Sequence, residues 1–425
     1  MTGSTLVLTP IENPCLEPLV EVLTAKIATT FNRRKALRPD DALRFATTLL
    51  ALLNLVIACA LMRIPAVDGV PLRLGNSDYV RTPISITALR FILMALEVLG
   101  FIRVEKGHYN RESGRGRVTR IHPRPALKEL AESYGLTAAK LLQPPAEVTL
   151  LHDSETTDPM PTCLGEGEHI IRRWNSMIGD ARVRLAASDV EQVERIIRQR
   201  AEEGDEVPIL RGYDEAKLHL VRIFKGSWDR GGRVYGGSFQ NLPKAFRSRL
   251  TINGEEVVEL DFRGLHPAIL YAEAGKRLDF DPYLVPGSGQ GREAGKVQFL
   301  RLINSKGIQK TKSPLKFDKE TGRFFSTKAD FDAYMHGMIA LHERIAHNFK
   351  RDQGMRLQKA DSDLALAIMA ECMERNIIVL PVHDSFIVQA RHRDTLHSVM
   401  LEQFRSRYGM DINIHCNDCI MFADN

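Results

Sequence analysis

Two aspartates follow segments of the chain that have the sequence pattern of β-strands. Asp261 ends Val257-Val-Glu-Leu-Asp261, which comes after an Asn-Gly hairpin turn and precedes a short helix that Pro267 is expected to open. Asp384 lies at the tip between two apolar strands predicted within residues 377–389. Carboxylates at strand ends bind hard cations, so a fold that joins these two would create a metal site. The alternative is that both are ordinary turn residues, with His383 and Asp384 as a local hydrogen-bonded pair.

A pair of basic residues lies between the two aspartates in the sequence. Arg292 and Lys296 follow a glycine-rich stretch and are four residues apart in a predicted helix, which places them on one face. A solvated helix surface would have the same pattern. Next to two metal-binding carboxylates, however, two such cations would bind a triphosphate.

The elements that carry these residues belong to a chain of 425 residues, of which 44% are hydrophobic and 26% charged, with a net charge of +5. These values are typical of a soluble globular protein with roughly two or three domains. Six scattered cysteines predict no disulfide framework, which favours a reducing, cytoplasmic location. The apolar run at residues 46–62 is short for a membrane span and contains Asn54, so we expect a buried helix and no membrane association.

Residues 1–143 have the pattern of a winged-helix-like domain that binds nucleic acid or a partner protein. A helix near residues 42–62 is followed by a second helix, which Ser85 or Thr87 would cap. A strand at 101–105, a turn at 107–116 and a returning strand at 117–122 would form the wing. Basic residues outnumber acidic ones around this hairpin, which fits a phosphate backbone; docking of a protein and simple solubility remain alternatives.

Residues 144–167 are predicted to form a linker between this domain and the rest of the chain. The stretch is acidic, contains several prolines and has no lysine or arginine. Such a composition, without hydrophobic periodicity, is typical of a connecting segment.

The order of five segments resembles the family A DNA polymerases and the phage and mitochondrial single-subunit RNA polymerases. Gly232–Pro243 is similar to the stretch before motif A, and Asp261 matches the motif A aspartate. Arg292 and Lys296 match the Arg-x3-Lys pattern of the O helix. Gln358-Lys-Ala-Asp-Ser-Asp363 matches the helix before motif C, and Val382-His-Asp-Ser matches motif C itself. The resemblance covers roughly residues 205–425.

This resemblance implies an α+β fold: a right-hand polymerase palm, made of an antiparallel sheet with helices, with reduced fingers and thumb. The polymerase domain would span residues 168–425. Its small thumb would be 168–204, its palm 205–287 and 352–425, and its fingers 288–351, including a basic insert from Lys306 to Lys328.

The resemblance also implies a template-directed DNA polymerase that transfers dNMP to a primer 3′-hydroxyl with two Mg²⁺ ions, for which Mn²⁺ could substitute. Asp261, Asp384 and the Phe262 carbonyl would bind the metals, and Lys296 would assist catalysis as a proton donor. Nucleotide binding would involve Arg292, Lys296, His266 and Phe262. The residues expected to contact primer–template are Arg233, Gln240, Asn241, Gln358 and His383.

Three departures from the family pattern bear on the choice of sugar. His266 stands where the DNA enzymes have glutamate, and its bulk favours deoxynucleotides. Leu300 and Asn304 replace aromatic residues of the O helix, and Ser385 replaces the motif C glutamate, so ribonucleotides remain open.

The expected partners are a DNA primer–template, dNTPs and a replicative helicase or another replication protein, in the setting of a phage or mobile-element primase-polymerase. One alternative is a DNA-dependent RNA polymerase or primase that uses NTPs. Another is a non-enzymatic winged-helix initiator with a degenerate palm.

Overall fold

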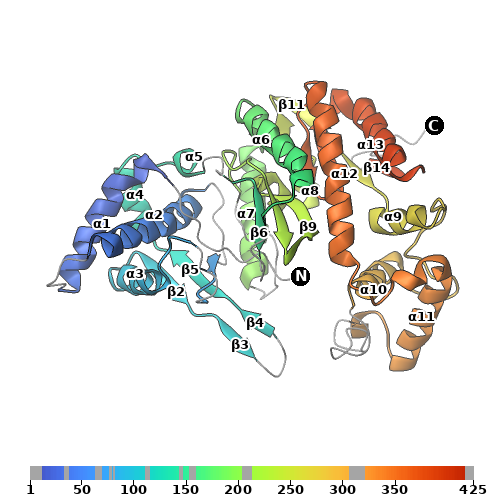
Figure 1. Cartoon of the computed structure of the whole chain (residues 1–425), viewed down its shortest axis with the longest axis horizontal. Helices are drawn as coiled ribbons and strands as arrows, with labels where there is room; N and C mark the ends of the chain where they lie inside the picture. Colours follow the sequence, from blue (N-terminus) through green and yellow to red (C-terminus); the bar gives the residue numbers. More distant parts are fainter. Residues whose placement is uncertain are drawn as a thin grey trace. The chain divides into compact units, whose positions relative to one another are not determined.

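The computed structural model describes residues 12–32, 38–62, 69–75, 79, 82–110, 115–142, 147–152, 159–202, 213–305 and 321–416 (Figure 1). The fold is a mixture of α-helices and small β-sheets, which agrees with the predicted α+β class. The chain divides into two compact units. The first unit comprises Met1–Pro144, Arg184–His219 and Gly237–Arg249, and the second comprises Pro145–Val183, Leu220–Gly236 and Leu250–Asn425.

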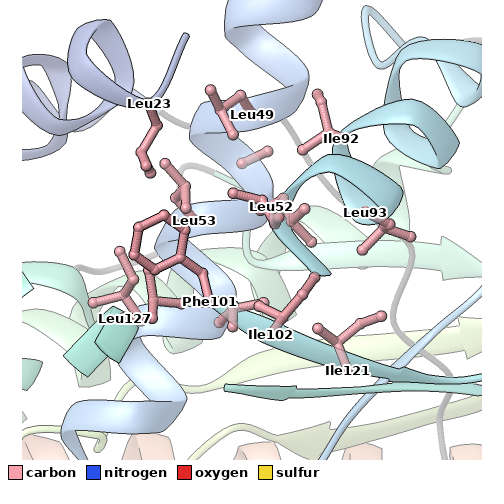
Figure 2. Packing of buried hydrophobic residues seen from close by; sticks show 14 of the residues in the cluster. Leu23, Leu49, Leu52, Leu53, Ile92, Leu93, Phe101, Ile102, Ile121 and Leu127 are labelled. Atoms are coloured by element: carbon pink, nitrogen blue, oxygen red, sulfur yellow. The ribbon is translucent and has the colours of Figure 1, made fainter. Parts of the chain in front are cut away.

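The first unit is built around α2 (Pro39–Leu61), against which α1 (Glu17–Thr30) and α3 (Ile86–Val98) pack. A three-stranded sheet in the order β1 (Val70–Leu72), β5 (Thr119–Pro123), β2 (Ile102–Glu105) closes one side of this core. Figure 2 shows leucines of α2 directed toward aliphatic side chains of α3, β2 and β5. Periodic burial of leucine and isoleucine therefore stabilises this part of the fold.

Helix α2 is the described helix that is long and apolar enough to cross a membrane, with a mean hydropathy of 1.9 over its best window. More than half of that window is buried inside the protein. Leu49, Leu52 and Leu53 are fully buried in the core. These contacts are those of a core helix, as the sequence predicted.

The hairpin after α3 is longer than the sequence predicted. Ser85 caps α3 by accepting a hydrogen bond from the backbone N–H of Ala88, as expected. The residues assigned to the turn contain two further paired strands, β3 (His108–Asn110) and β4 (Arg115–Arg117). The predicted ten-residue turn is therefore wrong, because His108–Asn110 pair with Arg115–Arg117. The winged-helix assignment itself stays a prediction.

The remaining elements of the first unit are short, apart from one long helix, α7. They are η1 (Pro14–Leu16), α4 (Pro125–Ser133), α5 (Ala138–Leu141), α7 (Ala187–Glu202), η4 (Ser238–Asn241) and α8 (Lys244–Arg247).

The predicted linker at residues 144–167 is wrong in its described part. Residues Thr149–His152 form β6, which pairs in parallel with β8 (Val221–Lys225), and η3 (Thr162–Leu164) leads directly into α6 (Gly165–Gly179). As the edge strand of its sheet, β6 forms backbone hydrogen bonds with β8, which acidic composition alone did not indicate. The predicted thumb, 168–204, also differs from the structure, since α6 belongs to the second unit and α7 to the first.

The main sheet of the second unit carries both candidate aspartates. Its strands follow the order β12 (Leu380–Val382), β13 (Ser385–Gln389), β11 (Glu255–Phe262), β10 (Thr251–Ile252) and β7 (Val183–Arg184), with β14 (Ile414–Cys416) also paired to β11. Asn253 and Gly254 both have positive φ and join β10 to β11, which confirms the predicted hairpin turn.

A second sheet and a set of helices complete this unit. In that sheet β8 lies between β6 and β9 (Ser227–Tyr235). Figure 1 shows the long helix α12 (Gly354–Glu374), which packs against β9, α9 (Leu265–Glu273) and α10 (Arg292–Asn304). The other elements are η5 (Thr321–Arg323), α11 (Lys328–Leu341), η6 (Glu343–Asn348), η7 (Ala390–His392) and α13 (Arg393–Tyr408). Helix α9 begins at Leu265, two residues before Pro267, so the predicted start was wrong.

Candidate active site

Strand register brings Asp261 and Asp384 together. In the antiparallel pair of β11 and β13, Asp261 lies opposite Ser385, the residue next to Asp384. The backbone N–H of Phe262 donates a hydrogen bond to the carbonyl oxygen of Asp384, with 3.2 Å between nitrogen and oxygen. Two residues that are distant in sequence, Asp261 and Asp384, therefore lie at the same end of two adjacent strands, and both are partly exposed.

The two carboxylates are a donor set that suits a hard divalent cation. Magnesium commonly binds through one or two carboxylates and completes its shell with water and substrate phosphates. Among the described residues no group of three or more His, Cys, Asp or Glu side chains is arranged to hold a metal. The Phe262 side chain is in the core, at ring-centroid distances of 6.3 Å from Phe386 and 6.1 Å from Phe404, which leaves only its backbone for such a role.

The turn that carries Asp384 is held by its neighbours. His383 has a positive φ of 61°, which allows only two residues to join β12 to β13. Its ring lies edge-on to Tyr235 of β9 at 5.6 Å between centroids. Ser385, which departs from the family pattern, is buried and donates a hydrogen bond of 2.6 Å to the carboxylate of Glu259. Its hydroxyl therefore serves the strand pair and not the aspartate site.

Arg292 lies at the start of α10 between an acidic and an aromatic partner. Its Nε donates to Asp281 at 2.8 Å, and its guanidinium carbon lies 4.8 Å from the centroid of the Tyr283 ring. Burial raises the pKa of Tyr283 well above its ordinary value; Arg292 opposes this, while Asp384, Asp281 and Asp261 add to it. Tyr283 is therefore within electrostatic reach of the two carboxylates, and Arg292 lies against the Tyr283 ring.

Helix α10 touches the Tyr283 segment with its backbone. A methyl group added at Gly295 would overlap the carbonyl oxygen of Tyr283, so only glycine permits this approach. Lys296 is the next residue and is exposed, one turn from Arg292. The predicted helix with two cations on one face is thus present, and Gly295 fixes its distance from Tyr283.

A buried carboxylate on α12 joins two of the predicted site residues. Arg233 Nε donates to both oxygens of Asp361 at 3.1 and 3.2 Å, and its Nη2 pairs with the same carboxylate. His266 Nε2 lies 2.8 Å from Asp361 Oδ2 and 3.5 Å from Arg233 Nη2. A carboxylate only accepts, so the imidazole carries its proton on Nε2 and leaves Nδ1 as an acceptor when neutral.

The charges in this network support one another. The Asp361 side chain is 1% exposed, and burial alone would raise its pKa. The hydrogen bond from His266 and the charge of Arg233 outweigh burial, so the pKa of Asp361 lies below its ordinary value. Burial lowers the pKa of Arg233, but Asp361 and then Asp384 outweigh it and the pKa is raised. Arg233 is therefore close enough to sense the charge of Asp384.

The other residues predicted to contact primer–template fall in two places. Gln358 is on α12, three residues before Asp361 and half-buried, and His383 is in the turn with Asp384. Gln240 and Asn241 end η4, in the first unit. The part of the basic insert between residues 306 and 320 lies outside the described residues.

Sequence reasoning missed several residues that the structure places around the site: Asp361, Glu259, Asp281 and Tyr283. Two of them left a signal in the sequence. Asp361 is one turn from Gln358 in the quoted helix, and Glu259 is two residues before Asp261, on the same face of a strand. Asp281 and Tyr283 lie in a segment without periodicity, where spacing gives no such signal.

The comparisons with known proteins found a structural similarity but no match by sequence. No protein-family profile matches the chain, and no curated protein matches it. Among solved structures, the chain is similar to the POL domain of Pol1 from M. smegmatis in complex with DNA primer-template and dNTP. The sequence identity is 12%, the match covers 54% of this chain and 51% of that chain, and the TM-score is 0.30.

Proposed function

We propose that the protein is a template-directed DNA polymerase that transfers dNMP to the 3′-hydroxyl of a primer. The observation that carries this proposal is the register of β11 and β13, which joins Asp261 to the Asp384 turn. Two adjacent carboxylates with two cations on a neighbouring helix are the side chains that nucleotidyl transfer needs.

Asp261 and Asp384 would hold two Mg²⁺ ions, with the Phe262 carbonyl as a further ligand and Mn²⁺ as a substitute. When bound, the ions would lower the pKa of the attacking hydroxyl and neutralise the leaving pyrophosphate. Arg292 would exchange its pairing with Asp281 for the triphosphate, and Lys296 would donate a proton to the leaving group. Arg233, Gln358 and His383, together with Gln240 and Asn241, would bind primer–template. A helicase or another replication protein would be the partner of the first unit.

The test is extension of a labelled primer on a DNA template with Mg²⁺, with dNTPs and NTPs supplied separately. We expect extension with dNTPs, loss of extension in Asp384→Asn, and full activity in Asp411→Asn. Asp411 is a matched control because it pairs with Arg405 at the surface.

Each other outcome assigns a different function. Efficient extension with NTPs would make the protein an RNA polymerase or primase. Extension with neither nucleotide would contradict the proposed activity and favour the non-enzymatic initiator.

A further inference from the structure

We propose that Asp361 is a positioning residue for the reaction proposed above, which holds Arg233 and His266 beside the sugar of the reacting nucleotide. The inference rests on the proposed function and extends it to a residue that the sequence left without a role. Asp361 lies in the middle of α12 and is nearly inaccessible to solvent.

The geometry shows that one carboxylate fixes two side chains. Arg233 comes from β9 and His266 from the start of α9, and both point to Asp361 on α12. Ser362, the next residue, donates to the backbone carbonyl of Gly232 and holds β9 against the same helix. Three elements therefore meet at Asp361, and neither Arg233 nor His266 can move without losing a charged hydrogen bond.

A second aspartate on the same helix provides the contrast. Asp363 pairs with Arg222, which is 2% exposed, and also with Lys359 and Arg407. None of these three partners is among the residues that the structure places beside Asp261 and Asp384. Asp361 and Asp363 are thus alike in chemistry and lie on the same helix, although the Asp363 side chain is 18% exposed against 1% for Asp361, and the partners of Asp361 are the ones that approach the reacting centre.

The chemistry of nucleotidyl transfer indicates what those partners would face. The groups that react at two metal-binding carboxylates are a 3′-hydroxyl and an α-phosphate, and both are attached to a sugar. Tyr235, two residues after Arg233 on β9, packs against His383 beside Asp384 at 5.6 Å between ring centroids, and His266 lies 3.5 Å from Arg233. An imidazole locked with Nε2–H toward Asp361 would then present a fixed edge to the sugar. A fixed edge rejects an additional hydroxyl better than a mobile one.

The experiment compares Asp361→Asn with Asp363→Asn. It measures kcat and KM for single-nucleotide insertion opposite one template base with a dNTP and with the matching NTP. In Asp361→Asn we expect the ratio of the two kcat/KM values to fall about tenfold, in the range that pocket contacts supply. In Asp363→Asn the ratio stays as in the wild type, even if thermal stability falls. Equal ratios in both variants would overturn the positioning role and leave Asp361 as a structural residue.

A second pair of variants keeps the test decisive if Asp361→Asn does not fold. His266→Gln retains an N–H donor toward Asp361 and is expected to preserve the ratio better than His266→Ala. Equal ratios in these two variants would contradict the inference. A wild-type chain that uses neither nucleotide would overturn the proposed function, and the role of Asp361 with it, so the two failures are distinguishable.

Discussion

The two units of this protein bury different kinds of side chain. Among the described residues of the first unit, the buried polar groups are uncharged, such as Asn13 and Thr48. The second unit buries Arg222, Glu259 and Asp361. Burial of a charge costs several kcal/mol unless the charge is paired and hydrogen-bonded. The difference indicates that the first unit is organised mainly by apolar packing, whereas the second also depends on buried charges that are paired or hydrogen-bonded.

The largest expected effect separates function from folding in the second unit. If the protein has the proposed function, Asp261→Asn should lower primer extension about a thousandfold, since the loss of a carboxylate proposed to bind the metal would remove roughly 4 kcal/mol of transition-state stabilisation. The free energy of unfolding should change by less than about 0.5 kcal/mol, because Asp261 is partly exposed at a strand end.

Extension assays combined with urea unfolding of the same samples check this prediction. A large drop in the unfolding free energy of Asp261→Asn would mean that Asp261 stabilises the fold. The residue could then no longer be assigned to function as distinct from folding.

The next effect compares a volume-preserving substitution in the interior of the first unit with the loss of a paired charge in the interior of the second. Leu52→Met in the first unit should cost less than about 1.5 kcal/mol, because an apolar core tolerates swaps of similar volume. Asp361→Leu in the second unit should cost about 3 kcal/mol, because it leaves Arg233 without its carboxylate.

Urea unfolding of both variants gives the two values, with Leu52→Ala as a reference expected to cost about 3 kcal/mol. If Leu52→Met and Asp361→Leu lower the free energy of unfolding equally, the buried ion pair of Asp361 is no more sensitive to substitution than the aliphatic core.

A smaller effect is expected at the backbone contact of α10. Alanine in place of glycine normally stabilises a helix by up to about 1 kcal/mol. At Gly295 the added methyl group would overlap the Tyr283 carbonyl, so Gly295→Ala should instead destabilise by roughly 1–3 kcal/mol.

Gly179→Ala is the control, since a methyl group at this end of α6 would meet open space. The melting temperatures of both variants test this prediction. A higher melting temperature for Gly295→Ala than for the wild type would show that α10 is free to move away from Tyr283.

The smallest effect is the dependence of stability on pH near neutrality. His342 is fully buried, its Nε2 lies 2.8 Å from the Pro282 carbonyl oxygen, and its Nδ1 lies 3.2 Å from the Tyr271 hydroxyl. Burial lowers the pKa of His342 below its ordinary value of 6.5, although the hydrogen bond to Pro282 opposes this. The unfolded chain therefore takes up a proton first as pH falls. The stabilisation is complete above about pH 6.5 and decreases below it.

Urea unfolding at pH 7.5 and pH 5.5 measures this loss, and His342→Gln should reduce it. A variant with an unchanged pH dependence would assign the effect to His122 or His219, whose pKa values burial also lowers.

The sequence predicted most reliably the features that depend on local pattern. Ser85 as a helix cap, the Asn253-Gly254 turn, the start of α10 at Arg292 and the two strands around Asp384 are all present. These follow from short-range steric and hydrogen-bonding preferences.

The predictions that failed depend on pairing between distant segments. Strand β6 pairs with β8, about seventy residues later, so the composition of the predicted linker gave no sign of it. The partners of Asp361 come from β9 and α9, and their pairing exists only after three elements have packed. Local pattern located the carboxylates and cations of the site but not the buried network beside them.

The backbone contact at Gly295 also constrains how the protein could move. Arg292 pairs with Asp281 and lies over the ring of Tyr283, so side chains and backbone connect the same two segments. A rotation of α10 about its own axis would break all of these contacts at once. Any hinge that brings Arg292 and Lys296 toward a triphosphate must therefore lie outside both segments, and Tyr283 would travel with the helix. Under the proposed function, binding of a nucleotide would then displace α10 and Tyr283 together as one rigid body.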